Sequence, residues 1–228
     1  MRSDPNSPTF VCDGYECHWQ MTRIEKIAFH TLIKKIAPKN ALEIGTYKGG
    51  SLQILSEFSE HVYSMDITDE PKKNLSHLYT NVDFIVGDSK KYLPDFLTNL
   101  QKEGKGLDFI LIDGDHSASG VRTDINNILK YYVPQSELFI ICHDSFNPGC
   151  RRGIVEAEWA DCPYVDMVEV DFVPGVYHYE AFDTAEARSM WGGFALARLM
   201  PEKRQEPLTV HQSQQGLFNA VYKDSTSG

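Results

Sequence analysis

Short apolar runs that alternate with helical patterns constrain the fold of this chain more than any other feature. From residue 41 onward, five such runs are each followed by a segment with helix signals, and two more runs come after residue 165. Strands that are apolar along their whole length are typical of a parallel sheet with helices on both faces. The sequence therefore predicts an α/β protein. Its predicted strands are 41–45, 61–67, 82–89, 107–115, 137–144, 166–174 and 192–200.

The length and the start of the first helix suggest how the chain is divided. It has 228 residues, of which 42% are hydrophobic, and this suits one globular domain. Thr22 and Glu25 form a T-x-x-E capping box at the first predicted helix. We expect an N-terminal segment at 1–20 that is a lid or an interface, a main domain at 21–200, and a polar tail at 201–228.

Charge, hydropathy and cysteine content exclude several classes of partner. The net charge of −10 argues against a nucleic-acid partner, because a phosphate backbone needs basic residues. The chain has no apolar run of about 18 residues that would span a membrane. Its first ten residues lack the apolar segment of a secretory signal. The five cysteines are scattered and odd in number, so we expect reduced thiols in a cytoplasmic protein.

A glycine-rich turn follows the first predicted strand. In "EIGTYKGGS" (43–51), the glycines let backbone approach a ligand closely, just before a helix begins. Asp66 ends the second strand about 20 residues after Gly45, where an acidic residue can bind both ribose hydroxyls. Asp88 and Ser89 end the third strand and suit an adenine edge, although Asp88 could equally cap the next helix. These features predict an adenosine-containing ligand.

Acidic residues also end the fourth and fifth strands. The carboxylates of Asp113 and Asp144 should converge, which calls for a cation, a shared proton or separation. A divalent metal is one solution. His143 is then a third ligand, or it points into the layer beneath and hydrogen-bonds there. His116 lies just beyond the strand, where it is a candidate general base or an exposed surface histidine. Asp115 could cap a helix or add a ligand.

These motifs resemble a known family. "ALEIGTYKGGSL" resembles the first motif of class I S-adenosylmethionine-dependent methyltransferases. "FILIDGDHS" with the later "HDS" is similar to the family that includes cephalosporin-hydroxylase-like proteins and macrolide-sugar O-methyltransferases. The resemblance covers about residues 20–200. It implies a three-layer, Rossmann-like sandwich whose seven-stranded sheet is mostly parallel, with an antiparallel last strand at 192–200.

The resemblance also implies the residues that contact S-adenosylmethionine. These are Glu43, Gly45, Thr46, Tyr47, Ser51, Asp66, Asp88, Ser89 and Asp113. In metal-using relatives, an aspartate after the fourth strand and an acidic pair after the fifth hold magnesium. A histidine three residues after the first aspartate is the base.

Asp113, His116 and Asp144 match this pattern, but His143 stands in place of the first acid of the pair. A nitrogen ligand suits manganese, iron or zinc better than magnesium. Alternatively, Asp115 supplies the missing oxygen, or no metal binds.

The resemblance implies methyl transfer from S-adenosylmethionine to a hydroxyl of a small acceptor, such as a sugar or natural product. His116 would be the base, and a divalent metal ion (magnesium or manganese) would assist. Residues 15–21 and 175–191 are predicted lids or surfaces of a homo-oligomer. A nicotinamide-dependent oxidoreductase would share the glycine turn and Asp66, but the turn does not read G-x-G-x-x-G. A non-catalytic adenosine-binding protein and an iron-dependent oxygenase are further alternatives.

Overall fold

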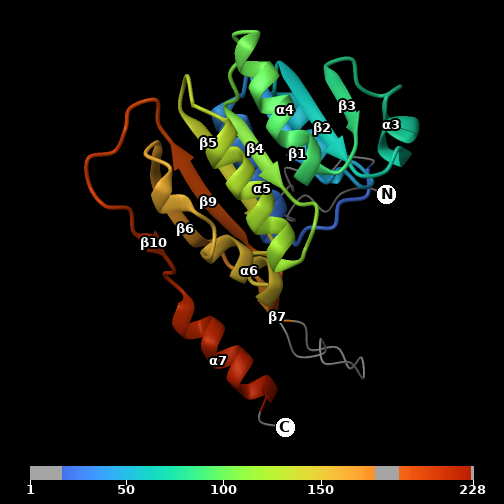
Figure 1. Ribbon diagram of the computed structural model, residues 1–228. Helices are drawn as coiled ribbons and strands as arrows, with labels where there is room; N and C mark the ends of the chain where they lie inside the picture. Colours follow the sequence, from blue (N-terminus) through green and yellow to red (C-terminus); the bar gives the residue numbers. More distant parts are fainter. Residues whose placement is uncertain (1–16, 178–189, 227–228) are drawn as a thin grey trace.

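A computed structural model describes residues 17–177 and 190–226 (Figure 1). Its centre is an eight-stranded sheet in the order β10-β6-β9-β5-β4-β1-β2-β3. Neighbouring strands pair in parallel, except that β9 is antiparallel to both β5 and β6. The strands are β1 Asn40–Ile44, β2 His61–Asp66, β3 Val82–Val86, β4 Phe109–Ile112, β5 Leu138–His143, β6 Val165–Val173, β9 Phe194–Leu199 and β10 Val210–His211. The short strands β7 (Val176–Tyr177) and β8 (Met190–Trp191) pair separately.

Helices cover both faces of the sheet (Figure 1). Strand side chains alternate between two apolar cores, as the pleat requires. Leu42 of β1 packs in the core beneath α4, α5 and α6, whereas its neighbour Ala41 packs in the core beneath α1 and α2. The helices are α1 Arg23–Ile36, α2 Gly50–Phe58, α3 Glu70–Leu75, α4 Ser89–Lys102, α5 Ala118–Tyr131, α6 Pro148–Val155 and α7 Gln215–Thr226.

The predicted α/β sandwich is confirmed, including all seven strands and the antiparallel direction of the last one. The capping box is also present, because Thr22 accepts from the Glu25 amide and Glu25 accepts from the Thr22 amide. Asn147 caps α6 through the amides of Gly149 and Cys150, so the helix starts at Pro148.

The C-terminal segment has more structure than its polar composition indicated. It adds β10 as an eighth strand, parallel to β6. The buried guanidinium of Arg151 pairs with Asp171 at 2.6 Å and donates to Gln212 and Gln215 at 3.3 and 2.9 Å. A two-residue strand is too short to show a hydrophobic period in the sequence. Only contacts with residues far away in the chain therefore define β10.

The topology places the candidate site. The sheet is extended from β1 in both directions, to β2 on one side and to β4 on the other. Such a reversal opens a crevice at the carboxyl ends of the strands. The described helices include none that is both long enough and apolar enough to cross a membrane.

Candidate active site

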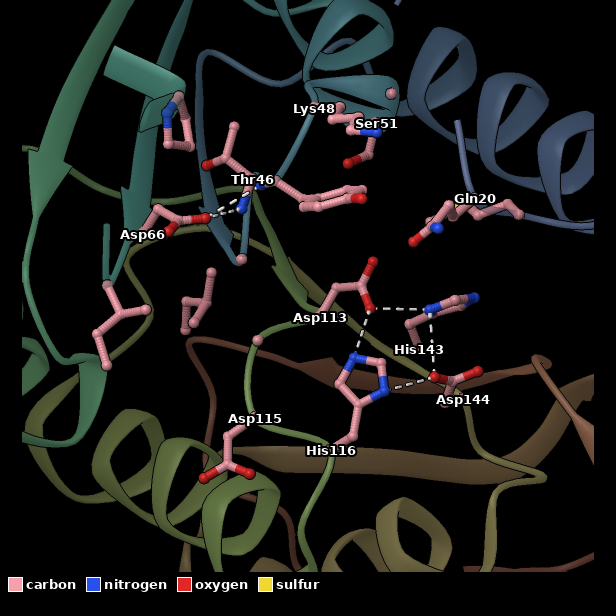
Figure 2. A pocket seen from close by; sticks show the side chains of 18 of the residues that line it. Gln20, Thr46, Lys48, Ser51, Asp66, Asp113, Asp115, His116, His143 and Asp144 are labelled. Atoms are coloured by element: carbon pink, nitrogen blue, oxygen red, sulfur yellow. Dashed lines mark hydrogen bonds and ion pairs between the residues drawn. The ribbon is translucent and has the colours of Figure 1, made fainter. Parts of the chain in front are cut away.

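The glycine turn after β1 wraps over the end of the sheet. Gly45 has φ +91°, and a Cβ atom there would lie 2.2 Å from the carbonyl oxygen of Asp113, the residue that follows β4. Only glycine allows this close approach. The turn is held from the other side by Asp66, whose Oδ2 accepts hydrogen bonds of 3.0 Å from the amides of Thr46 and Tyr47. The end of β2 therefore fixes the shape of the turn that ends β1 (Figure 2).

A cavity of about 1050 Å³ opens beside this turn. Its walls are the β1–α2 turn, the ends of β2 to β5, and the segment 18–22 before α1. Ligand pockets measure roughly 300–1,000 Å³, so a nucleoside derivative and a second small molecule fit together. The wall at 18–21 lies within the first predicted lid. Val176 and Trp191 line the cavity from the second, whose residues 178–189 lie outside the described residues.

Polar residues at the end of β3 form the far side of the cavity. Asp88 caps α4 by accepting from the amide of Lys90 at 3.1 Å. Ser89 donates its hydroxyl to the buried Asp124 at 2.8 Å. Both residues line the cavity, and Asp88 is also the helix cap that was its alternative role.

Asp115 turns away from the other acidic residues (Figure 2). It pairs with Lys90 at 2.5 Å and accepts from the Ser117 amide at 2.8 Å. Burial pushes the pKa of Asp115 upward, but the bonds from Lys90 and Ser117 outweigh it and lower the pKa to about 2. Ser117, not Asp115, caps α5. Asp115 therefore neither caps the helix nor supplies an oxygen to the cluster around Asp113.

Asp113, His116, His143 and Asp144 meet at the ends of β4 and β5 (Figure 2). The strands are paired in register, so the residues that follow them emerge side by side. His143 Nδ1 lies 2.8 Å from Asp113 Oδ1 and 3.9 Å from Asp144 Oδ2. One donor atom from each of Asp113, His143 and Asp144 lies within 4.8 Å of the others. The predicted convergence of the Asp113 and Asp144 carboxylates is therefore present in the structure, and His143 lies beside them.

His116 and Asp144 form a directed pair. His116 Nδ1 lies 2.9 Å from Asp144 Oδ2, whereas its Nε2 is 3.7 Å from Asp113 Oδ1, too far for a hydrogen bond. Nδ1 therefore carries the proton, and the unprotonated Nε2 points toward Asp113, which lines the same cavity. Asp144 has φ +57°, and its other oxygen accepts from the Gly192 amide at 2.8 Å. Such strained backbone persists only where surrounding contacts hold it, as they do at active sites.

The charges around this pair shift its protonation. The hydrogen bond with Asp144 raises the pKa of His116 above its usual value, and this outweighs the effect of burial. Burial raises the pKa of Asp144, but the bond from His116 and the charge of His143 lower it overall. Asp144 is therefore a carboxylate at neutral pH, and His116 accepts a proton more readily than a free histidine does.

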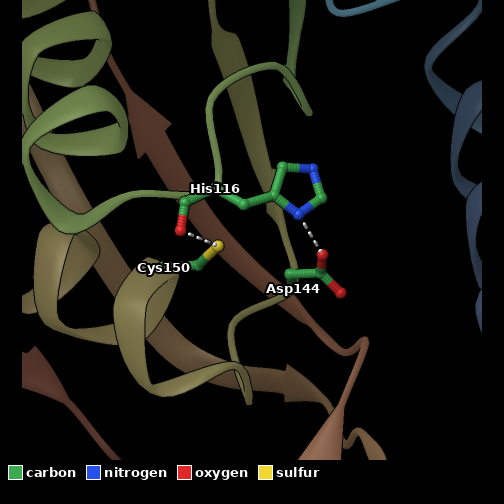
Figure 3. Close-up of side chains that lie close together, drawn as sticks. All are labelled: His116, Asp144 and Cys150. Atoms are coloured by element: carbon green, nitrogen blue, oxygen red, sulfur yellow. Dashed lines mark hydrogen bonds and ion pairs between the residues drawn. The ribbon is translucent and has the colours of Figure 1, made fainter. Parts of the chain in front are cut away.

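Cys150 supports the loop that carries His116 (Figure 3). Its thiol, on α6, donates to the carbonyl oxygen of His116 at 3.4 Å. Burial raises the pKa of Cys150, so the thiol stays protonated and is not a reactive thiolate.

Comparisons with known proteins agree with this geometry. Residues 42–145, which hold the turn and the whole acidic cluster, match the model of a methyltransferase domain family. This part of the chain is therefore similar to S-adenosylmethionine-dependent methyltransferases. A search of curated proteins found no matching sequence.

Solved methyltransferase structures share the fold of this chain. An O-methyltransferase from Bacillus cereus, in complex with S-adenosylhomocysteine, is 20% identical over 75% of this chain and 79% of its own (TM-score 0.53). TomG, an O-methyltransferase from Streptomyces achromogenes, is 16% identical over 76% and 78% (TM-score 0.53). MycE from the mycinamycin pathway is 16% identical over 80% of this chain (TM-score 0.52), but this chain spans only 51% of MycE. Identities this low establish the fold alone.

The sequence did not point to two parts of the candidate site. Glu25 is read from the sequence only as a helix cap, yet its Oε1 lies 3.2 Å from His143 Nε2 and accepts from the Gly193 amide at 2.5 Å. Gly192, whose amide holds Asp144, lies beyond the loop that was predicted as a lid. Neither contact has a local signal, because the partners are 118 residues apart in one case and 48 in the other.

Glu43 is buried beneath the turn and does not line the cavity, in contrast to the expectation from the resemblance. Its Oε1 accepts from the hydroxyl of Ser51 at 2.5 Å. Burial raises the pKa of Glu43 to about 8, so it is mostly protonated at pH 7. Glu43 thus supports the turn from below as a neutral group.

This raised pKa predicts a stability effect of Glu43→Gln. Between pH 4.5 and about 8 the folded protein keeps a proton that the unfolded chain releases, so the free energy of unfolding falls as the pH rises. The slope is up to about 1.4 kcal/mol per pH unit. Glu43→Gln should flatten the loss of stability between pH 6 and 8, as urea unfolding would measure. The exposed control Glu202→Gln should keep the wild-type slope, and an equally steep slope in both variants would contradict the prediction.

Proposed function

We propose that this protein transfers a methyl group from S-adenosylmethionine to a hydroxyl oxygen of a small acceptor, with His116 as the general base. The observation that carries the proposal is the orientation of His116. Its Nδ1 is bound to Asp144, so Nε2 is unprotonated and points toward Asp113, in the cavity that also contains the glycine turn and Asp66. A base and a nucleoside site therefore share one chamber.

The chain's own residues fit the methyl donor. Asp66 holds the turn through Oδ2, while its Oδ1 accepts from the amide and hydroxyl of Thr68 at 2.9 and 3.0 Å. Ribose hydroxyls would replace the Thr68 hydroxyl, which can rotate away. Asp88 and Ser89 would contact the adenine, and Gly45, Thr46, Tyr47 and Ser51 would contact the methionine part. When bound, S-adenosylmethionine supplies a methyl group already activated by its sulfonium.

The proton moves from the acceptor to His116. As the acceptor oxygen forms its bond to the methyl carbon, His116 Nε2 takes the hydroxyl proton, and Asp144 stabilises the imidazolium that results. The walls of the cavity hold the acceptor in line with the methyl donor. This proximity and orientation contribute to the rate of the transfer. The products are the methylated acceptor, S-adenosylhomocysteine and a proton that His116 returns to water.

The solved neighbours support the choice of acceptor. MycE was solved with mycinamycin VI, and TomG takes part in tomaymycin synthesis. The cavity of this chain is large enough for an acceptor of that class beside a nucleoside. Trp19, Gln20 and Trp191 line it and offer aromatic faces and an amide, which suit a sugar or a ring system.

Binding of S-adenosylhomocysteine tests the proposal. Calorimetric titration should show one site on the wild-type protein. Asp66→Asn should weaken the affinity about 10–100-fold, because a hydrogen bond to a charged group contributes about 1.5–3 kcal/mol. Asp95→Asn, on the exposed side of α4, removes the same charge and should leave the affinity unchanged. Absence of any binding by the wild-type protein, with binding of NADH instead, would overturn the proposed function in favour of an oxidoreductase.

A further inference from the structure

Both ring nitrogens of His143 face carboxylate oxygens. Nδ1 lies 2.8 Å from Asp113 Oδ1, and Nε2 lies 3.2 Å from Glu25 Oε1. The side chain is 7% exposed and packs against Phe194 with ring centroids 5.5 Å apart, so the ring is fixed. A neutral imidazole has a single N–H, and its other nitrogen would point a lone pair at a carboxylate. Two favourable contacts require a proton on each nitrogen, or a protonated carboxyl partner.

The proton belongs to His143 and not to Glu25. Glu25 Oε1 also accepts from the Gly193 amide, and Oε2 accepts from the Thr22 amide, both at 2.5 Å. Backbone N–H donors on both oxygens stabilise the ionised carboxylate relative to the protonated acid. Burial raises the pKa of Glu25, but the bond and charge of His143 lower it overall. Burial likewise opposes a charged His143, and the Asp113 and Glu25 carboxylates reverse this and raise its pKa well above the usual value.

This proton arrangement does not fit a divalent metal ion. The spacing of Asp113, His143 and Asp144 would allow one, but a ligand atom must offer a lone pair. His143 has none when both nitrogens carry protons. The oxygens of Asp144 already accept from His116 Nδ1 and the Gly192 amide. Asp115, the alternative oxygen donor, is turned toward Lys90.

We propose that the His143 imidazolium, held between Glu25 and Asp113, replaces the divalent cation of metal-using relatives, so that this methyltransferase needs no metal. The inference rests on the proposed function. The positive charge of the imidazolium offsets the negative charges of the carboxylates around it. Without it, these carboxylates would repel the negative charge that develops on the acceptor oxygen as His116 removes its proton. Glu25 is then a positioning residue, which acts only through His143.

Metal binding is the decisive measurement, because it does not depend on an acceptor. The full chain, with and without S-adenosylhomocysteine, is titrated with Mg²⁺ and Mn²⁺ by calorimetry. We expect no saturable binding up to millimolar metal. Binding of one ion per chain that Asp113→Asn abolishes would overturn the proposal.

The proton count on His143 can be read directly. At pH 7.5, both ¹⁵N nuclei of the His143 ring should have the chemical shifts of a protonated imidazolium, assigned by their loss in His143→Asn. A neutral ring, with one nitrogen unprotonated, would also overturn the proposal. The shifts are measured on the wild-type protein, and the variant serves only for their assignment.

His143→Asp should create the metal dependence that the wild-type protein lacks. It removes the fixed cation and restores an acidic pair beside Asp113, so Mn²⁺ should bind at least 100-fold more tightly than to the wild-type protein. His61→Asp is the matched control, because His61 also pairs with an aspartate, Asp83, at 3.1 Å, but on the surface. It should bind no more Mn²⁺ than the wild-type protein. Equally weak Mn²⁺ binding by His143→Asp and His61→Asp would contradict the proposal that the imidazolium replaces the metal ion.

Failure of this inference and failure of the proposed function give different results. If the methyl donor does not bind, S-adenosylhomocysteine titrations are flat whatever the metal does. If only the metal inference fails, S-adenosylhomocysteine still binds and Mn²⁺ binds with it.

Discussion

His116→Asn lowers kcat by roughly 10²–10⁴-fold, the contribution typical of a positioned general base. Asparagine keeps a polar side chain of similar size but cannot accept the proton. Affinity for S-adenosylhomocysteine should change by less than about twofold, because His116 contacts the acceptor side of the cavity. The measurement is formation of S-adenosylhomocysteine with a hydroxyl acceptor that the wild-type protein turns over, such as one found in a screen of sugars and natural products.

A matched histidine serves as the control. His61 also lies beside an aspartate, but at the start of β2, outside the cavity. His61→Asn should keep wild-type kcat. If both variants lost activity equally, the loss would reflect stability. If His116→Asn kept full turnover, His116 would not be the base.

The pH dependence of the rate gives a second test of the same residue. Only unprotonated His116 accepts a proton, and the bond with Asp144 raises its pKa, so log(kcat/KM) should rise with pH and level off above pH 6.5. Asp113, Asp144 and His143 all face His116, while the thiol of Cys150 contacts its carbonyl oxygen. Asp144→Asn removes the main cause of the shift, so the plateau should begin at lower pH and at a lower rate.

Gly45→Ala should unfold the site and much of the domain with it. The alanine Cβ would lie 2.2 Å from the carbonyl oxygen of Asp113 and 2.5 Å from its carbon, both backbone atoms of the neighbouring strand end. Relief requires β1 and β4 to separate at the point where they enter the site. We expect a loss of at least roughly 3 kcal/mol in the free energy of unfolding, measured by urea denaturation, and no S-adenosylhomocysteine binding.

A substitution at Gly104 separates the two causes of that loss, which are the positive φ and the contact of the new Cβ atom with Asp113. Gly104 also has a positive φ, +72°, but a Cβ there would meet no atom within 4 Å. Gly104→Ala therefore measures the backbone term alone, about 1–2 kcal/mol, and should leave binding intact. If the two variants lost the same stability, the close approach of Gly45 to Asp113 would not be a constraint.

The fold was largely predictable because its signals are local. The apolar runs that became β1 to β5 carry their hydrophobic pattern within a few residues, and Thr22 with Glu25 marks the start of α1 within four. The strands end where polar residues begin, so Asp66, Asp113 and Asp144 could be placed at one edge of the sheet. The eighth strand was missed, since Val210 and His211 pair with β6 through contacts that no local pattern shows.

The sequence by itself determined which residues reach the site from the strand ends, because strand order and spacing bring Asp113, His116, His143 and Asp144 together there. The tertiary structure decided what each of them does. It turned the Nδ1 proton of His116 toward Asp144 and turned Asp115 toward Lys90. It also brought Glu25 against His143 across 118 residues of chain. Protonation depends on partners in space, and packing brings those partners together from segments that share no sequence pattern.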